Sequence, residues 1–205
     1  QLALPPGSTV SEAGLATRYG FGKAAARGAL TRLRQERLVT SAPRQGHRVT
    51  DVTIADVEEV FDLRLSLEIL AARRACGRAN VSHLRGLDAL CARYRADDPA
   101  SRAAFLTANR DFHLAVAQAS RNQRLVDILG TLLSHAERAQ HIGLAHGGFG
   151  DTLTHQHAEL VDALADDDPD AAEDCVRRAL EGFRDQLIAH LTRSDAVRGA
   201  PLAAG

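Results

Sequence analysis

The chain has 205 residues, a net charge of −1 and 45% hydrophobic residues, enough for packed cores in one large or two small domains. Aromatic residues make up only 4% and Trp is absent, so we expect an aliphatic, mainly helical core, because Ala and Leu favour helices. No apolar stretch approaches the roughly 20 residues of a membrane span and no signal peptide is visible, which favours a cytoplasmic protein over a membrane or secreted one.

Charge divides the chain into a basic head and an acidic body. Residues 1–50 carry eight Lys or Arg side chains and two acidic ones, a net charge of +6. The remaining residues carry 17 basic and 24 acidic side chains, a net charge of −7. This division is typical of a nucleic-acid-binding module joined to a part that binds a different partner. A basic surface without a partner is the alternative that charge alone leaves open.

The basic head has the pattern of a winged helix-turn-helix. A short helix is predicted between its N-cap Ser11 and Gly20, which stands where a C-terminal glycine belongs. A second helix is predicted over 23–37. Three apolar residues are spaced along it as one buried stripe: Ala26, Leu30 and Leu33. Alternating apolar and polar residues over 38–41 and 47–50, on either side of a glycine-containing turn, predict a hairpin, the wing.

The rest of the chain is predicted to be helical. Residues 51–55 are expected to form a linker, 56–195 an all-α antiparallel bundle, and 196–205 a flexible tail. Six candidate helices are separated by turn signals, at about 56–79, 81–96, 101–119, 122–145, 150–166 and 169–193. The interior of such a bundle is a common place for a ligand.

The three cysteines and the chain start give two smaller expectations. Cys76, Cys91 and Cys175 are odd in number and widely spaced within helical patterns, so we expect reduced, buried thiols. The chain begins at Gln1 and contains no Met, from which we expect the native N-terminus of the DNA-binding domain to lie further upstream.

The start of the second predicted helix carries the residues that we expect to contact DNA. Lys23 and Arg27 lie four apart on one helix face and suit contacts with phosphate or guanine. Ala24 and Ala25 can approach thymine methyl groups. Arg44, at the tip of the wing, can reach a neighbouring phosphate or the minor groove.

Arg32 and Gly28 are two further notable positions on this helix. Arg32 is a possible DNA contact, although Arg32, Arg34 and Arg37 are more simply explained as a solvated face. Gly28 costs the helix about 1 kcal/mol relative to Ala, and its lack of a side chain suits close approach to a neighbour.

A series of motifs runs through nearly all of residues 5–50. It consists of Pro6-Gly7, Leu15-Ala16, Phe21 to Arg27, Ala29 to Leu33, Leu38-Val39 and Pro43 to Val49. This series resembles the winged-helix domain of GntR-family transcription regulators, which implies a DNA-binding role. The chain departs from the usual pattern at Gly22, where a Ser usually caps the recognition helix, at Lys23, usually Arg, and at Gly28, commonly Glu.

A second series spans about residues 55–190. It consists of Asp62-Leu63-Arg64, Glu68, Ala71-Ala72, Asn109, Phe112-His113, Ala119-Ser120, Asn122, Leu125, His157, Ala163-Leu164, Asp168-Pro169 and Ala171-Ala172. It resembles the FCD ligand-binding domain of the FadR branch, and six helices rather than seven resemble the VanR type. The resemblance implies a ligand-responsive regulator, which we interpret as a repressor. Because one helix-turn-helix covers few base pairs, we expect a homodimer, formed mainly through the large aliphatic body, on a palindromic double-stranded operator.

The resemblance also implies a possible metal site. Many FCD domains hold a divalent metal between an Asp and three His, and imidazole with carboxylate suits zinc. At the matching positions this chain has Asn109, His113, His157 and Ala179. Two strong ligands remain, so we interpret the site as degenerate, with a divalent metal such as zinc as a candidate cofactor. His113 and His157 are alternatively core histidines that hydrogen bond to their neighbours.

Direct binding of a small organic acid is a third interpretation. Arg64 and Arg138 match or lie near positions where such domains place basic residues, and a guanidinium binds carboxylate through two hydrogen bonds. Arg64 is alternatively the i, i+4 partner of Glu68. The candidate effector-binding residues are Arg64, Asn109, His113, Arg138 and His157.

A metal-dependent enzyme built on the bundle is the alternative function. It would use Asn109, His113 and His157, but Asp111, the nearest candidate base, points to the far side of the helix. No nucleophile motif or phosphate-binding loop accompanies them, so we predict that the protein is not an enzyme.

Overall fold

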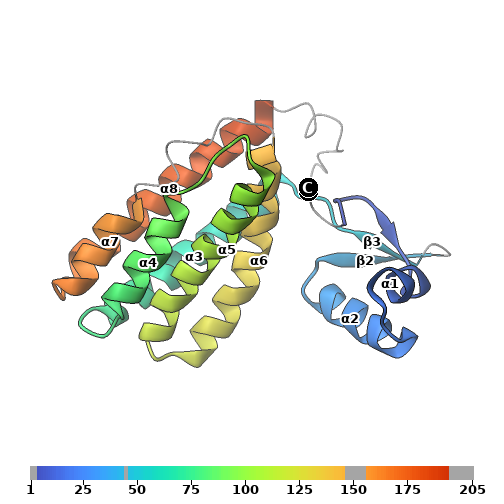
Figure 1. Cartoon of the computed structure of the whole chain (residues 1–205), viewed down its shortest axis with the longest axis horizontal. Helices are drawn as coiled ribbons and strands as arrows, with labels where there is room; N and C mark the ends of the chain where they lie inside the picture. The colour runs from blue at the N-terminus through green and yellow to red at the C-terminus, as the bar shows by residue number, and fades with distance from the viewer. Residues whose placement is uncertain (1–3, 44–45, 146–155, 194–205) are drawn as a thin grey trace. The chain divides into compact units, whose positions relative to one another are not determined.

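The computed structural model describes residues 4–43, 46–145 and 156–193. The chain folds into two compact units, Gln1–Val52 and Thr53–Gly205. The first unit combines two helices with a small sheet and the second is helical (Figure 1), which confirms the mainly α fold that the sequence predicts.

The first unit is a winged helix-turn-helix. Its elements in chain order are β1 (Thr9–Val10), α1 (Glu12–Tyr19), α2 (Lys23–Gln35), β2 (Val39–Ala42) and β3 (Gly46–Val49). The strands form an antiparallel sheet in the order β1-β3-β2, with Val39 opposite Val49 and Val10 opposite His47. β1 was not predicted, because two residues are too few to show the alternation of a strand.

Local signals set the ends of the two helices in this unit. The Ser11 hydroxyl accepts a hydrogen bond from the Gly14 amide at 3.0 Å, and Gly20 ends α1 with a φ of 69°, as predicted. α2 ends at Gln35 rather than at residue 37, because Arg37 turns the chain with a φ of 58°. The unit has an aliphatic core whose buried members are Val10, Leu15, Ala26, Leu30, Val39 and Val49.

The second unit is a bundle of six helices within the described residues. They are α3 (Ile54–Ala75), α4 (Val81–Cys91), α5 (Pro99–Ala119), α6 (Gln123–Ala145), α7 (Gln156–Ala165) and α8 (Pro169–Arg193). α3 packs against α5, α6 and α8, while α4 contacts α5 and α7 (Figure 1). Because α3 is shared by three neighbours, its polar side chains Arg64 and Glu68 are buried in the bundle interior.

The boundary between the units differs from the predicted linker at 51–55. α3 begins at Ile54 because Thr53 and Asp56 form a reciprocal capping box: the Thr53 hydroxyl accepts from the Asp56 amide, and the Asp56 carboxylate accepts from the Thr53 amide. The predicted linker therefore overlaps the first helical turn. The predicted tail at 196–205 and the first residues of the helix expected at 150–166 lie outside the described residues.

The cysteines are free and buried, as predicted: Cys76, Cys91 and Cys175. Burial raises the pKa of Cys91 to about 12, so this thiol stays protonated at neutral pH. No helix in the described ranges is long and apolar enough to cross a membrane.

Gly77 is required where α3 turns toward α4, and Gly86 on α4 provides a matched control. Gly77 has a φ of 65°, and a Cβ there would lie 2.9 Å from Asp167 Oδ1, whereas a Cβ at Gly86 would meet nothing within 4 Å. We expect Gly77→Ala to destabilise the protein by about 1–2 kcal/mol and Gly86→Ala to stabilise it by up to about 1 kcal/mol. Urea denaturation measures both, and equal midpoints for the two variants would contradict this assignment.

Candidate functional site

The outer face of α2 is a candidate DNA-contacting surface. The predicted contact residues on this helix are all exposed: Lys23, Ala24, Ala25, Arg27 and Arg32. Ala26 and Leu30 are almost fully buried on the opposite face, so the packing of the helix presents these side chains to solvent. A Cβ at Gly28 would meet nothing within 4 Å, so the glycine is not needed for packing inside this unit. Arg44 lies outside the described residues.

Arg27 already has a partner on α1. Its Nε and Nη2 atoms donate to the two carboxylate oxygens of Glu12 at 2.9 and 3.0 Å. The hydrogen bond with Arg27 lowers the pKa of Glu12, and the same bond raises the pKa of Arg27. Because the pair is exposed, its contribution to stability is small, and Arg27 can exchange Glu12 for a phosphate or a base at little cost.

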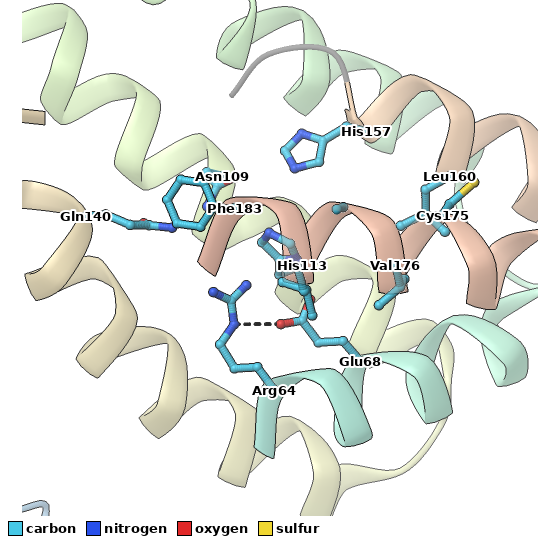
Figure 2. Close-up of a pocket in the computed structure, with 12 residues that line it drawn as sticks. Arg64, Glu68, Asn109, His113, Gln140, His157, Leu160, Cys175, Val176 and Phe183 are labelled. Atoms are coloured by element: carbon cyan, nitrogen blue, oxygen red, sulfur yellow. Dashed lines mark hydrogen bonds and ion pairs between the residues drawn. The ribbon is translucent and has the colours of Figure 1, made fainter. Parts of the chain in front are cut away.

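A pocket lies inside the helical bundle (Figure 2). Its cavity measures about 50 Å³, room for roughly three to five water molecules at about 10–15 Å³ each. Six polar side chains line it: Arg64, Glu68, Asn109, His113, Gln140 and His157. Apolar side chains of α7 and α8, among them Leu160, Val176 and Phe183, supply the rest of the wall. The pocket is therefore polar on one side and apolar on the other.

Four of the five predicted effector-binding residues meet in this pocket. Arg64 comes from α3, Asn109 and His113 from one face of α5, and His157 from α7. Arg138, the fifth, does not line it. Gln140 of the same helix does, and residues two apart on a helix point about 200° away from each other.

Arg64, Glu68 and His113 form a buried triad. The Arg64 Nε donates to Glu68 Oε1 at 2.7 Å, and His113 Nδ1 lies 2.6 Å from Glu68 Oε2. Arg64 is 1% and Glu68 5% exposed. Burial alone would raise the pKa of Glu68, but the charges of Arg64 and His113 outweigh it and lower this pKa to about 2. Glu68 is therefore a carboxylate at any physiological pH and fixes both neighbours.

His157 is held between an aromatic ring and a second carboxylate. It stacks on Phe112 with ring centroids 3.9 Å apart, and its Nδ1 lies 3.5 Å from Asp88 Oδ1, too long for a good hydrogen bond. Burial lowers the pKa of His157, which favours the neutral imidazole, and Asp88 opposes this shift. The rings of His113 and His157 lie 5.5 Å apart, edge to face, so both imidazoles border the same space.

Sequence reasoning missed three of the residues that define the site. Glu68 was considered only as a partner of Arg64, although its second oxygen orients His113. Gln140 and Asp88 lie on α6 and α4, and no spacing along the chain connects them with the histidines. Only the packing of helices that are distant in sequence brings these residues together.

The residues at the predicted metal positions fit a divalent cation poorly. His113 and His157 are good ligands, but Asn109 is neutral and Ala179 has no donor atom. Within the described residues, no group of three or more His, Cys, Asp or Glu side chains is arranged to hold a metal ion. Metal binding stays a prediction.

A winged helix-turn-helix joined to a helical bundle defines a class of DNA-binding regulators, and comparison with known proteins identifies the family. Residues 1–49 match the bacterial regulatory proteins of the gntR family, and 59–182 match the FCD domain. The chain belongs to the GntR family, in its FCD-containing branch, and is a DNA-binding transcription regulator rather than an enzyme.

Individual relatives agree with this assignment. The HTH-type transcriptional repressor RspR of Escherichia coli is 24% identical over 90% of this chain and 81% of its own length. The Nta operon transcriptional regulator of Aminobacter aminovorans is 24% identical over 95% of this chain and 89% of its own. Among solved structures, E. coli McbR/YncC has the same fold, with a TM-score of 0.75 at 21% identity, covering 91% of this chain and 90% of its own.

Replacing the three basic residues of the predicted DNA contacts should weaken DNA binding. We expect the Lys23→Ala, Arg27→Ala, Arg44→Ala triple variant to lose affinity and to show a shallower salt dependence, by about 0.9 units of log–log slope for each lost phosphate contact. Fluorescence anisotropy at several salt concentrations measures both. An unchanged affinity would remove these residues from the DNA interface.

Placing metal-binding side chains at positions 109 and 179 should create a metal site. We expect Asn109→Asp with Ala179→His to raise zinc affinity at least about tenfold, because an anionic ligand and a third imidazole complete the set. Calorimetry on metal-stripped protein makes the comparison. If the unaltered protein binds zinc as tightly as the double variant, the site is not degenerate.

Proposed function

We propose that this regulator is a repressor that leaves its operator when a small organic acid binds in the bundle pocket. The observation that carries the proposal is Arg64, a buried cation at the wall of a pocket in a DNA-binding protein. The relatives that are DNA-binding regulators support an action in the cytoplasm, where bacterial DNA lies.

The orientation of Arg64 favours a carboxylate as its ligand. Only its Nε is used by Glu68, and neither terminal nitrogen donates a hydrogen bond to another described residue. Figure 2 shows these two nitrogens turned away from Glu68, on the side of Asn109 and Gln140. Two parallel N–H donors match the two oxygens of a carboxylate, and such charge-assisted bonds are strong in a buried site.

The pocket is well placed to transmit binding. Its residues come from α3, α5, α6, α7 and α8, and α3 is the helix that directly follows the winged helix-turn-helix in the chain. A ligand that draws these helices together favours one arrangement of the bundle over another. A population shift of this kind changes the spacing of two DNA-binding units and hence operator affinity.

A homodimer on a palindromic operator is part of the proposal. One winged helix covers few base pairs, so specificity usually needs two half-sites related by a twofold axis. Leu63 and Leu70, two turns apart on α3, are 54% and 38% exposed, and they support the bundle as the dimerisation surface. Light scattering at tens of micromolar tests this, and a monomer with and without DNA would refute it.

The regulatory response is tested with an operator obtained by selection from random duplexes. We expect the selected site to be palindromic and a carboxylate that binds the pocket to weaken operator binding at least about tenfold. Arg64→Lys should abolish this response, since an ammonium lacks the paired donors of a guanidinium. Arg85→Lys, an exposed site paired with Asp162, is the control and should respond normally.

One result for these two variants would contradict the role of Arg64. If Arg64→Lys remains folded by circular dichroism and responds to the carboxylate as strongly as the control, Arg64 is not the effector-binding residue.

A further inference from the structure

Two aromatic side chains are exposed at the turn between α1 and α2. Tyr19 is 43% and Phe21 57% exposed, and no other Phe or Tyr among the described residues is exposed to this degree. Aromatic residues are scarce in this chain, with two Tyr and six Phe in all. Single exposed apolar side chains are common on protein surfaces, but two large ones in contact with each other mark a candidate binding surface.

The two rings form an ordered pair next to a positive charge. Their centroids lie 6.0 Å apart and their planes are inclined by 18°, the offset stacking that aromatic pairs prefer. The guanidinium carbon of Arg18 lies 5.6 Å from the centroid of the Tyr19 ring, within the range of a cation–π contact. Arg18 forms no ion pair with any residue that the structure describes, so its charge is available to a phosphate.

The main chain explains why residue 21 is apolar, but not why its ring is exposed. Gly20 has a φ of 69°, and the Phe21 amide donates to the Ala16 carbonyl at 3.0 Å, as in a Schellman turn. The apolar residue of such a turn commonly packs on its own helix, but Ala16 offers only a methyl group and most of the ring stays uncovered. The backbone at Phe21 is therefore fixed while its ring is open to a partner.

The place of this pair in the helix-turn-helix indicates that the partner is DNA. In this motif the second helix enters the major groove with its first residues at the base edges, while the first helix crosses the backbone. Phe21 lies between the two helices, two residues before Lys23, which begins α2. Arg18, Lys23 and Arg27 are exposed around the turn and complement the charge of phosphates. The aromatic pair thus continues the candidate DNA-contacting surface of α2 along the chain.

A thymine methyl group is the feature of DNA that fits an aromatic ring at this place. It is the apolar group among the base edges of the major groove, and Phe is one of the side chains that contact it. A phosphate is a poor partner for Phe21, since the ring has no hydrogen-bond donor. Removing the ring and a methyl group from water together is favourable.

We propose that Phe21 contacts the methyl group of a thymine in the operator and so contributes to sequence specificity. Tyr19 is a positioning residue that supports the ring from behind, and Arg18 lies at an adjoining phosphate. This assignment depends on DNA binding alone and not on the effector, so a failure of the bundle pocket to respond to a carboxylate leaves it intact.

Deoxyuridine in the operator tests the contact, because it lacks only the methyl group of thymidine. Each thymine of an operator selected from random duplexes is replaced in turn, and the affinity of the full chain is measured by fluorescence anisotropy. We expect one replacement to weaken binding about fourfold, the effect of about one buried methyl group. The proposal is overturned if the selected operator contains no thymine, or if no replacement weakens binding by the unaltered protein.

Phe21→Ala separates this contact from those predicted for Ala24 and Ala25. We expect the variant to bind the unmodified operator at least about threefold more weakly and to lose the preference for thymine over deoxyuridine at one position, while any other thymine keeps its effect. Leu90→Ala removes an exposed apolar side chain from α4, 49% exposed, and is the control that should keep every preference. Circular dichroism checks folding, and the measurements on the unaltered protein need no variant.

A preference for thymine that is the same in folded Phe21→Ala and in the control at every position would overturn the proposal. If light scattering then shows that Phe21→Ala changes the oligomeric state, the aromatic pair belongs to a protein–protein contact instead. For Tyr19, we expect Tyr19→Ala to reduce the preference and Tyr19→Phe to keep it, because only the second retains the stacked ring. Equal preferences in these two variants would contradict the supporting role of Tyr19.

Discussion

The ion pair between Arg64 and Glu68 is the constraint on which the helical body depends. Two opposite charges are buried on adjacent turns of α3, and each would be costly without the other. Because Glu68 also binds His113, the same carboxylate fixes a residue of α5. The interior of the bundle must therefore keep a polar region, and the pocket lies beside it, lined by these three side chains.

The elements that could be predicted from the sequence are those with local signals. Ser11 and Gly20 mark the ends of α1, and the apolar stripe of α2 is buried as its spacing indicates. Asn109 and His113 share a helix face, so their meeting in one pocket also follows from spacing. The capping box of Thr53 and Asp56 was a local signal too, and recognising it would have placed the start of α3 correctly.

The rest of the site depends on contacts that no local pattern encodes. Asp88 and His157 are far apart in the chain and meet only because α4 packs against α7. Gln140 lines the pocket and Arg138 does not, because the packing of α6 against its neighbours determines which face of this helix points inward. The sequence resemblance supplied the family and the matching positions, but the surroundings of those positions decide what they bind.

The pairing of Arg27 with Glu12 has a consequence for how the protein searches for its operator. Most DNA that the regulator encounters is non-specific, and if Arg27 contacts it as predicted, its two charge-assisted hydrogen bonds to Glu12 are exchanged for bonds to a phosphate. Because the pair is exposed, this exchange costs little and adds little affinity for random sequence. At a guanine with both O6 and N7 accessible, two new bonds replace the two that are lost and the nearby phosphates add further attraction. Glu12 thus holds the guanidinium in a defined position before DNA binds, which reduces the side-chain entropy that Arg27 would lose on meeting a base.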